Sequence, residues 1–124
     1  MPAYTALVLD KASRELLTRL VPPCHAKVFA DHVTLQVEPA SPIAEEFKGA
    51  CRVVGVRSDS KGQAVDVVLD ANCERLCAGH TPHITISCEG KTPPAYSNEM
   101  EAISTSIGFG LVLTGIVKTV LPKD

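Results

Sequence analysis

The alternation of apolar and polar residues predicts a chain made mainly of strands. Aliphatic and β-branched side chains dominate residues 3–9, 32–37, 51–57, 63–69 and 110–120 and a run that starts at His83. The linker SDSKG contains Ser, Asp and Gly between the third and fourth runs, so these two runs are expected to form a hairpin. The pattern predicts an α+β fold with a mostly antiparallel sheet.

Three short helices are expected between the strands. In residues 11–21, leucines and a valine recur at helical spacing, and Asp10 stands where a helix cap is expected. Asp70 has the same position before a second, shorter helix. The segment YSNEMEAIS, residues 96–104, predicts a third helix capped by Ser97 or by the residue that follows it.

Length and charge limit the kinds of function that the chain can have. Its 124 residues fit one domain, residues 1–124, and its 45% hydrophobic and 21% charged residues are typical of a globular protein. The net charge of -2 argues against an extended nucleic-acid surface, which needs many basic side chains. A local pocket for one or two phosphates is compatible with this charge.

Targeting and redox signals favour a cytoplasmic protein without a membrane segment. The start of the chain lacks a basic segment followed by a long apolar core, as a secretory signal needs. The most apolar region, residues 107–121, is interrupted by glycines and a lysine, so no membrane span is expected. Five cysteines are an odd number, which favours reduced thiols and no structural disulfides.

A histidine-bearing strand occurs twice in the chain. The segments H-V-T-L-Q-V-E, from His32, and H-I-T-I-S-C-E, from His83, align residue by residue, and each is followed further on by a hydroxyl residue and a proline. Strand alternation places His32 and Thr34 on one face, and His83 and Thr85 on one face, with aliphatic residues on the other. One such strand is ordinary, but two copies with matching flanks predict a functional pair.

Two opposed histidines suit displacement at phosphorus. One imidazole takes a proton from the attacking oxygen while the other gives a proton to the leaving oxygen. Threonine hydroxyls can hydrogen-bond the non-bridging phosphate oxygens. This chemistry requires neither a metal nor a cofactor.

The paired motifs HVTL and HITI resemble those of the two-histidine (2H) phosphoesterase superfamily. The segments AYTALVLD, PHITIS and KTPPAYSN also look like the cyclic phosphodiesterase domain of tRNA-ligase-type RNA repair proteins and their small stand-alone relatives. The resemblance implies a bilobal, pseudo-symmetric fold of mostly antiparallel sheets with a few helices. It also implies hydrolysis of 2',3'-cyclic phosphates at RNA ends or in nucleotides, commonly leaving a 2'-phosphate.

The resemblance also implies roles for individual residues. His32 would be the general acid and His83 the general base, with Thr34 and Thr85 binding the phosphate. The following Lys91, Tyr96 and Ser97 are possible cleft-lining residues. The expected partner is an RNA terminus or a small cyclic nucleotide, because the motifs lie close together in a compact chain with few aromatic residues for base stacking.

Two alternatives remain open at the level of sequence. The same cleft could bind a phosphate end without turnover. Alternatively, Cys73, Cys77, His80 and His83 have zinc-ligand chemistry, although four ligands within eleven residues is unusual spacing for a zinc finger.

Overall fold

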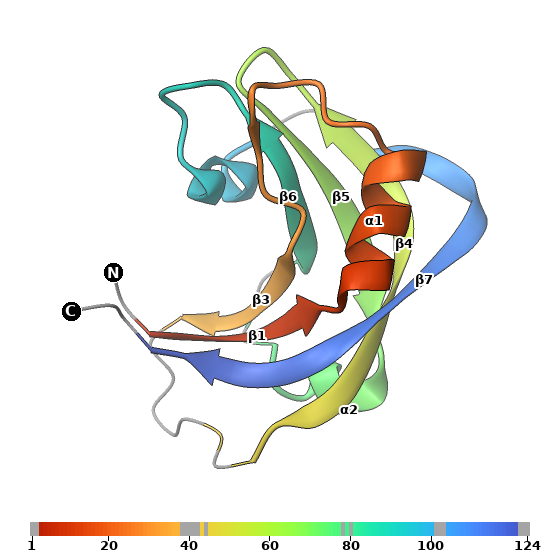
Figure 1. Cartoon of the computed structure of the whole chain (residues 1–124), viewed down its shortest axis with the longest axis vertical. Coiled ribbons are helices and arrows are strands. Elements are labelled where there is room, and N and C mark those ends of the chain that lie inside the picture. Colours follow the sequence, from red (N-terminus) through yellow and green to blue (C-terminus); the bar gives the residue numbers. More distant parts are fainter. Residues whose placement is uncertain are drawn as a thin grey trace.

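One curled antiparallel sheet dominates the structure (Figure 1). The computed structural model describes residues 3–37, 43, 45–77, 79, 81–100 and 104–121, with residues 107–109 described by their backbone alone. Its strands are β1 (Tyr4–Leu9), β2 (Lys27–Val28), β3 (His32–Val37), β4 (Phe47–Ser58), β5 (Gly62–Leu69), β6 (His83–Cys88) and β7 (Thr105–Val120). In this described part of the chain, seven strands pair in the order β2-β6-β5-β4-β7-β1-β3. The predicted mostly antiparallel sheet and the β4–β5 hairpin are confirmed.

Two short α-helices lie among the described residues, and both begin at the predicted aspartates. Helix α1 (Lys11–Leu20) starts after Asp10, whose carboxylate accepts a 2.8 Å hydrogen bond from the N–H of Ser13. Helix α2 (Ala71–Glu74) starts after Asp70, whose carboxylate accepts a 2.8 Å bond from the N–H of Cys73. These contacts satisfy N–H groups that the first helical turn leaves unpaired. Neither helix, nor any other within the described residues, could cross a membrane.

The third predicted helix was wrong in position and in type. A 3₁₀ helix, η1 (Pro94–Asn98), follows Pro93 and has no side-chain cap. Proline fits the first turn of a helix because the N–H that it lacks would be unpaired there, so the helix begins earlier than expected. Ser97 is therefore inside the 3₁₀ helix, and residues 101–103 of the predicted segment lie outside the described residues.

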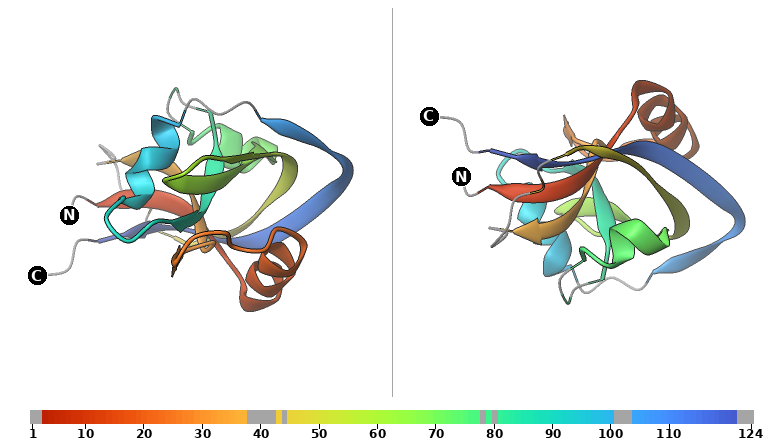
Figure 2. Two further views of the ribbon diagram at one scale, coloured as in Figure 1. Left: turned by 90° about the horizontal axis from the view of Figure 1, so that it is seen from above. Right: turned by 90° about the horizontal axis from the view of Figure 1, so that it is seen from below.

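The two longest strands, β4 and β7, form the middle of the sheet and curve strongly (Figure 2). Their ladder runs from the pair Phe47 and Val117 to the pair Val56 and Thr105, with an irregularity after Val53. Both strands start earlier than the sequence predicted, because their outer halves continue the same ladder. This curvature brings the outer strands β3 and β6 towards each other, and these strands are in contact.

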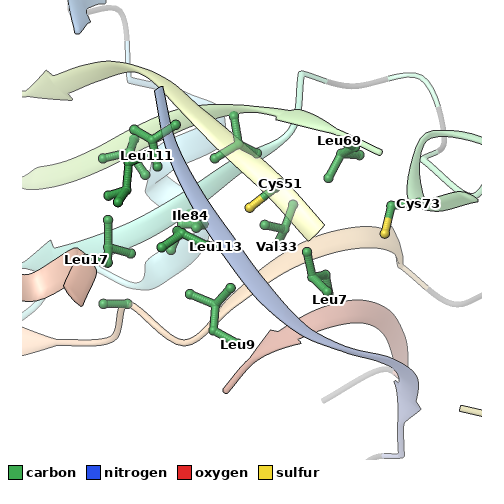
Figure 3. Packing of buried hydrophobic residues seen from close by; sticks show 14 of the residues in the cluster. Leu7, Leu9, Leu17, Val33, Cys51, Leu69, Cys73, Ile84, Leu111 and Leu113 are labelled. Carbon is green, nitrogen blue, oxygen red and sulfur yellow. The ribbon is translucent and has the colours of Figure 1, made fainter. Parts of the chain in front are cut away.

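Among the described residues, one cluster of buried side chains fills the inside of the curl (Figure 3). The cluster includes Leu17 from α1, Leu113 from β7, Val33 from β3 and Ile84 from β6, all fully buried. Both motif strands are therefore anchored in the same core. Burying each such side chain contributes about 1.5–3 kcal/mol relative to leaving it exposed.

Candidate functional site

The two motif histidines are the first residues of their strands. His32 begins β3 and His83 begins β6, and both are partly exposed. The next residue in each strand points into the core, so the histidine and the threonine two positions later lie on the face turned away from the core. Thr34 and Thr85 are accordingly half-buried.

A change of hydrogen-bonding partner at Ala30 and Asp31 links the two motifs. The N–H of Ala30 donates a 2.8 Å bond to the carbonyl of Thr85 on β6, whereas the carbonyl of Asp31 accepts a 2.9 Å bond from the N–H of Leu9 on β1. Ala30 has a φ of 52°, a left-handed conformation that turns the chain from one edge of the sheet to the other. His32 lies two residues after Ala30, a span of at most about 7 Å.

His32 has a carboxylate and an aromatic ring as neighbours. Its Nδ1 lies 2.7 Å from Oδ1 of Asp31, and its ring centroid lies 5.2 Å from that of Tyr4, with the rings tilted by 32°. The hydrogen bond from His32 lowers the pKa of Asp31. Because an ionised carboxylate only accepts hydrogen bonds, Nδ1 of His32 carries the proton in this contact.

His83 has a neutral partner at the same ring position. Its Nδ1 lies 3.1 Å from the carbonyl oxygen of Thr81. A carbonyl only accepts hydrogen bonds, so Nδ1 of His83 is also the protonated nitrogen. In the neutral ring the acceptor lone pair is therefore on Nε2, which is the arrangement that a proton acceptor needs.

The hydroxyl of Thr85 points to η1. It donates a 3.1 Å hydrogen bond to the carbonyl of Pro94 and lies 2.7 Å from Oγ of Ser97, which is only 1% exposed. Because Thr85 has one hydroxyl proton and gives it to Pro94, Ser97 is the donor in the bond between the two hydroxyls. Binding of a phosphate oxygen by Thr85 would require this proton to turn away from Pro94.

A cavity of about 470 Å³ opens beside His83, and its described lining residues are of polar or charged types. Its described lining residues are Arg57, Asp66, Thr81, His83, Ser97, Asn98 and Ser104. The guanidinium of Arg57 lies 3.1 Å from the carboxylate of Asp66, and both side chains are mostly buried. Arg57 also donates a 3.1 Å bond to the carbonyl of Met100, so the ion pair holds the segment after η1 against the sheet. Among the described lining residues His32 is absent, so the structure does not bring both histidines into this cavity.

Of the three residues predicted to line a cleft after the second motif, Ser97 lines the cavity. Tyr96 instead donates its hydroxyl proton to the carboxylate of Asp59, in the turn between β4 and β5. Lys91 is exposed, and its N–H donates a 3.1 Å bond to the side chain of Glu89.

The residues of the possible zinc site are only partly described. Cys73 is fully buried, and a Cβ built at Gly49 would lie 2.7 Å from its sulfur. Burial raises the pKa of Cys73 to about 12, which opposes the thiolate form that zinc binds. Within the described residues no group of three or more metal-ligating side chains could hold an ion, and His80 lies outside these residues.

Sequence reasoning missed Asp31, Tyr4, Arg57 and Asp66. Asp31 stands directly before His32 in the sequence DHVTL, but neighbours within a strand point to opposite faces. Their side chains meet because Asp31 precedes the strand and follows the left-handed turn at Ala30. Asp66 lies opposite His83 in the β5–β6 ladder, a pairing that residue spacing does not predict.

Comparison of the chain with protein-family models gives no match, and comparison with curated proteins gives none either. The function must be inferred from the residues and their arrangement.

Proposed function

We propose that the chain is a metal-independent phosphodiesterase of the 2H type. Its substrates are 2',3'-cyclic phosphates of RNA ends or small nucleotides, and its catalysis is general acid-base catalysis by His32 and His83. The observation that carries this proposal is the main-chain hydrogen bond from Ala30 to Thr85, because it ties the start of one motif strand to the other motif. The five free thiols favour a reducing compartment such as the cytoplasm.

The strand order supports a bilobal, pseudo-symmetric arrangement of the 2H kind. The sheet can be divided into β3-β1-β7 and β6-β5-β4, with a motif strand at the outer edge of each half apart from the short β2. The N–H of Asp10 donates a 3.1 Å bond to Thr114 of β7, and the N–H of Asp70 donates one of 3.1 Å to Ala50 of β4. Ala50 and Thr114 lie directly opposite each other, so a pseudo-twofold axis would pass through this pair.

The outer strands deviate from this symmetry by an even number of residues. His32 lies opposite Val8, two residues before Asp10, whereas His83 lies opposite Asp66, four residues before Asp70. A shift of two residues keeps side chains on the same face of a sheet. The deviation therefore shifts the two histidines relative to each other along the strand direction, but it leaves both on the same face of the sheet.

The proposed reaction starts with His83 neutral, so that its Nε2 accepts a proton, and with His32 as an imidazolium that carries a proton on each nitrogen. Nε2 of His83 takes a proton from water, whose oxygen forms a bond to phosphorus. The bond between phosphorus and the 3' oxygen breaks with its electron pair on that oxygen, which receives the proton from Nε2 of His32. The hydroxyls of Thr34 and Thr85 bind the non-bridging oxygens, and the product is a 2'-phosphate.

The test is hydrolysis of nucleoside 2',3'-cyclic monophosphates and a cyclic-phosphate-ended oligonucleotide in the presence of a chelator. His32→Ala and His83→Ala should each lower kcat about 10²- to 10⁴-fold, the usual contribution of a general acid or base. His25→Ala is the matched control, because this histidine bonds the carbonyl of Asp59 and lies outside both motifs. Wild-type turnover should show a bell-shaped dependence on pH, and ³¹P NMR should identify a 2'-phosphate.

The outcomes separate the enzyme from its main alternative. Binding of the cyclic nucleotide by wild-type protein without turnover would support a phosphate-end binding module instead. Turnover that survives in both motif variants, or that requires an added metal, would contradict the proposal.

A further inference from the structure

We infer that Asp31 is a positioning residue for His32: it holds Nδ1–H of the ring, so that Nε2–H is the proton given to the leaving group. This inference rests on the proposed function. Each histidine is the first residue of its strand, and the two rings differ in the partner of Nδ1.

The contact between Asp31 and His32 has the geometry of a charge-assisted hydrogen bond. At 2.7 Å it is shorter than the 3.1 Å bond between His83 and the carbonyl of Thr81. Hydrogen bonds to an ionised acceptor are roughly twice as strong as those between neutral groups. The lowered pKa of Asp31, which His32 causes chiefly through this bond, keeps the carboxylate ionised at neutral pH.

The surroundings hold the pair in place. Tyr4 of β1 lies against the His32 ring, and the guanidinium of Arg14 on α1 donates bonds of 3.0 and 3.2 Å to the carbonyl of Phe29. Arg14 therefore fixes the segment directly before Ala30, and its charge also lowers the pKa of Asp31. The titratable and charged groups named here come from β1 and α1, which pack beside the pair.

The different hydrogen-bond partners of Nδ1 favour different roles for the two histidines. A carboxylate stabilises a positively charged imidazolium more strongly than a main-chain carbonyl does. In the reaction, the bond between Nε2 and its proton breaks as the bond between the leaving oxygen and that proton forms. The ring is then neutral with its proton on Nδ1, the form that Asp31 already binds, so no rearrangement of the ring is needed.

The first test measures which nitrogen of the His32 ring carries the proton, and it does not depend on activity. Protein labelled with ¹⁵N-histidine should show, by long-range ¹H–¹⁵N NMR above neutral pH, that neutral His32 carries its proton on Nδ1. Asp31→Ala should shift this proton towards Nε2, whereas Asp31→Asn, which retains an oxygen acceptor, should preserve part of the wild-type state. Glu15→Gln on α1 is the matched control, because it removes the same charge from an exposed carboxylate paired with Lys11.

Kinetic measurements then test whether the contact between Asp31 and His32 contributes to catalysis. Asp31→Ala should lower kcat about ten- to a hundredfold, a part of the usual effect of a general acid, with KM changed less than threefold. Asp31→Asn should give an intermediate rate, and Glu15→Gln should match wild type. An unchanged His32 tautomer in Asp31→Ala, or a changed tautomer with an unchanged kcat, would overturn the inference. Absence of turnover by wild type would instead overturn the proposed function, and the NMR result would still decide whether Asp31 holds the ring.

Discussion

Ala30 donates its main-chain N–H to the carbonyl oxygen of Thr85 across 2.8 Å, at the place where the two outer regions of the sheet meet. The next residue, Asp31, already bonds β1, so the chain changes sides between two consecutive residues. A left-handed conformation costs a residue with a side chain about 1–2 kcal/mol. Such strain is often located at functional sites, and here it lies directly before Asp31 and His32.

The conformation of Ala30 predicts different responses to two substitutions. Ala30→Gly should change the free energy of unfolding by less than about 1 kcal/mol. The relief of backbone strain stabilises the variant, whereas loss of the buried methyl group and the greater conformational entropy of the unfolded chain destabilise it by a similar amount. Ala30→Val should destabilise by about 2 kcal/mol or more, because a β-branched side chain fits neither the left-handed backbone nor the fully buried position. Urea denaturation measures both, and equal stabilities of the two variants would contradict the assigned conformation.

Gly115 allows β1 and β7 to lie close together. A Cβ at this position would lie 2.1 Å from the carbonyl oxygen of Val8 and 2.9 Å from the Cα of Leu9, so the backbone would have to move. Gly115→Ala should therefore lower the free energy of unfolding by about 2 kcal/mol or more. Gly90→Ala is the matched control, because a Cβ there meets nothing within 4 Å, and it should be neutral or slightly stabilising. Similar thermal unfolding of both variants would disprove the close approach.

The hydroxyl pair of Thr85 and Ser97 predicts a coupled effect on stability. Thr85→Val leaves the buried Ser97 hydroxyl without this partner and should cost about 1–3 kcal/mol. Adding Ser97→Ala should recover part of this loss, because removing both polar partners is less costly than removing one. Chemical denaturation of the single and double variants gives the coupling energy. Strictly additive losses would show that the two hydroxyls do not interact.

The hydrogen bonds to the carboxylate of Asp70 predict a loss of stability at acidic pH. Burial raises its pKa, but hydrogen bonds from the N–H groups of Cys73 and Ala50 outweigh burial and lower it below the ordinary value. The folded state therefore binds this proton more weakly than the unfolded state, and the stabilisation present above the ordinary pKa of about 4 is lost as pH falls below it.

Asp70→Ala removes both hydrogen bonds and the cap of α2. It should cost about 1–2 kcal/mol at pH 7 and less at pH 3, because below the ordinary pKa of about 4 the stabilisation from the ionised carboxylate is progressively lost. Urea denaturation at the two pH values measures the difference. An equal loss at both would mean that the charge of Asp70 contributes nothing.

The sequence predicts those parts of the fold whose determinants are local. Alternation around Val33 and Ile84 identifies the motif strands because every second side chain is buried, and an aspartate before an apolar helical pattern identifies each α-helix. The prolines before Tyr96 are a similar local signal for the start of η1, because proline fits the first turn of a helix.

The rest depends on contacts between distant segments. The alternation of apolar and polar residues indicates that β7 is buried on one face, but it does not indicate that β7 lies between β4 and β1. The contact of Asp31 with His32 depends on the conformation of Ala30, for which alanine gives no signal because glycine is the usual left-handed residue. The strand positions of the motif histidines were therefore predictable, whereas the different partners of their rings were not.

The central position of β7 has a consequence for how the molecule folds. Within the described residues β1 pairs with β3, and β4, β5 and β6 pair in turn, while β7 lies between these two groups and pairs with both β1 and β4. Strand β7 follows all of them in the sequence, so during synthesis the edges of β1 and β4 stay unpaired until it emerges from the ribosome. Folding should accordingly be slow, with contacts such as that between Thr5 and Thr119 among the last to form.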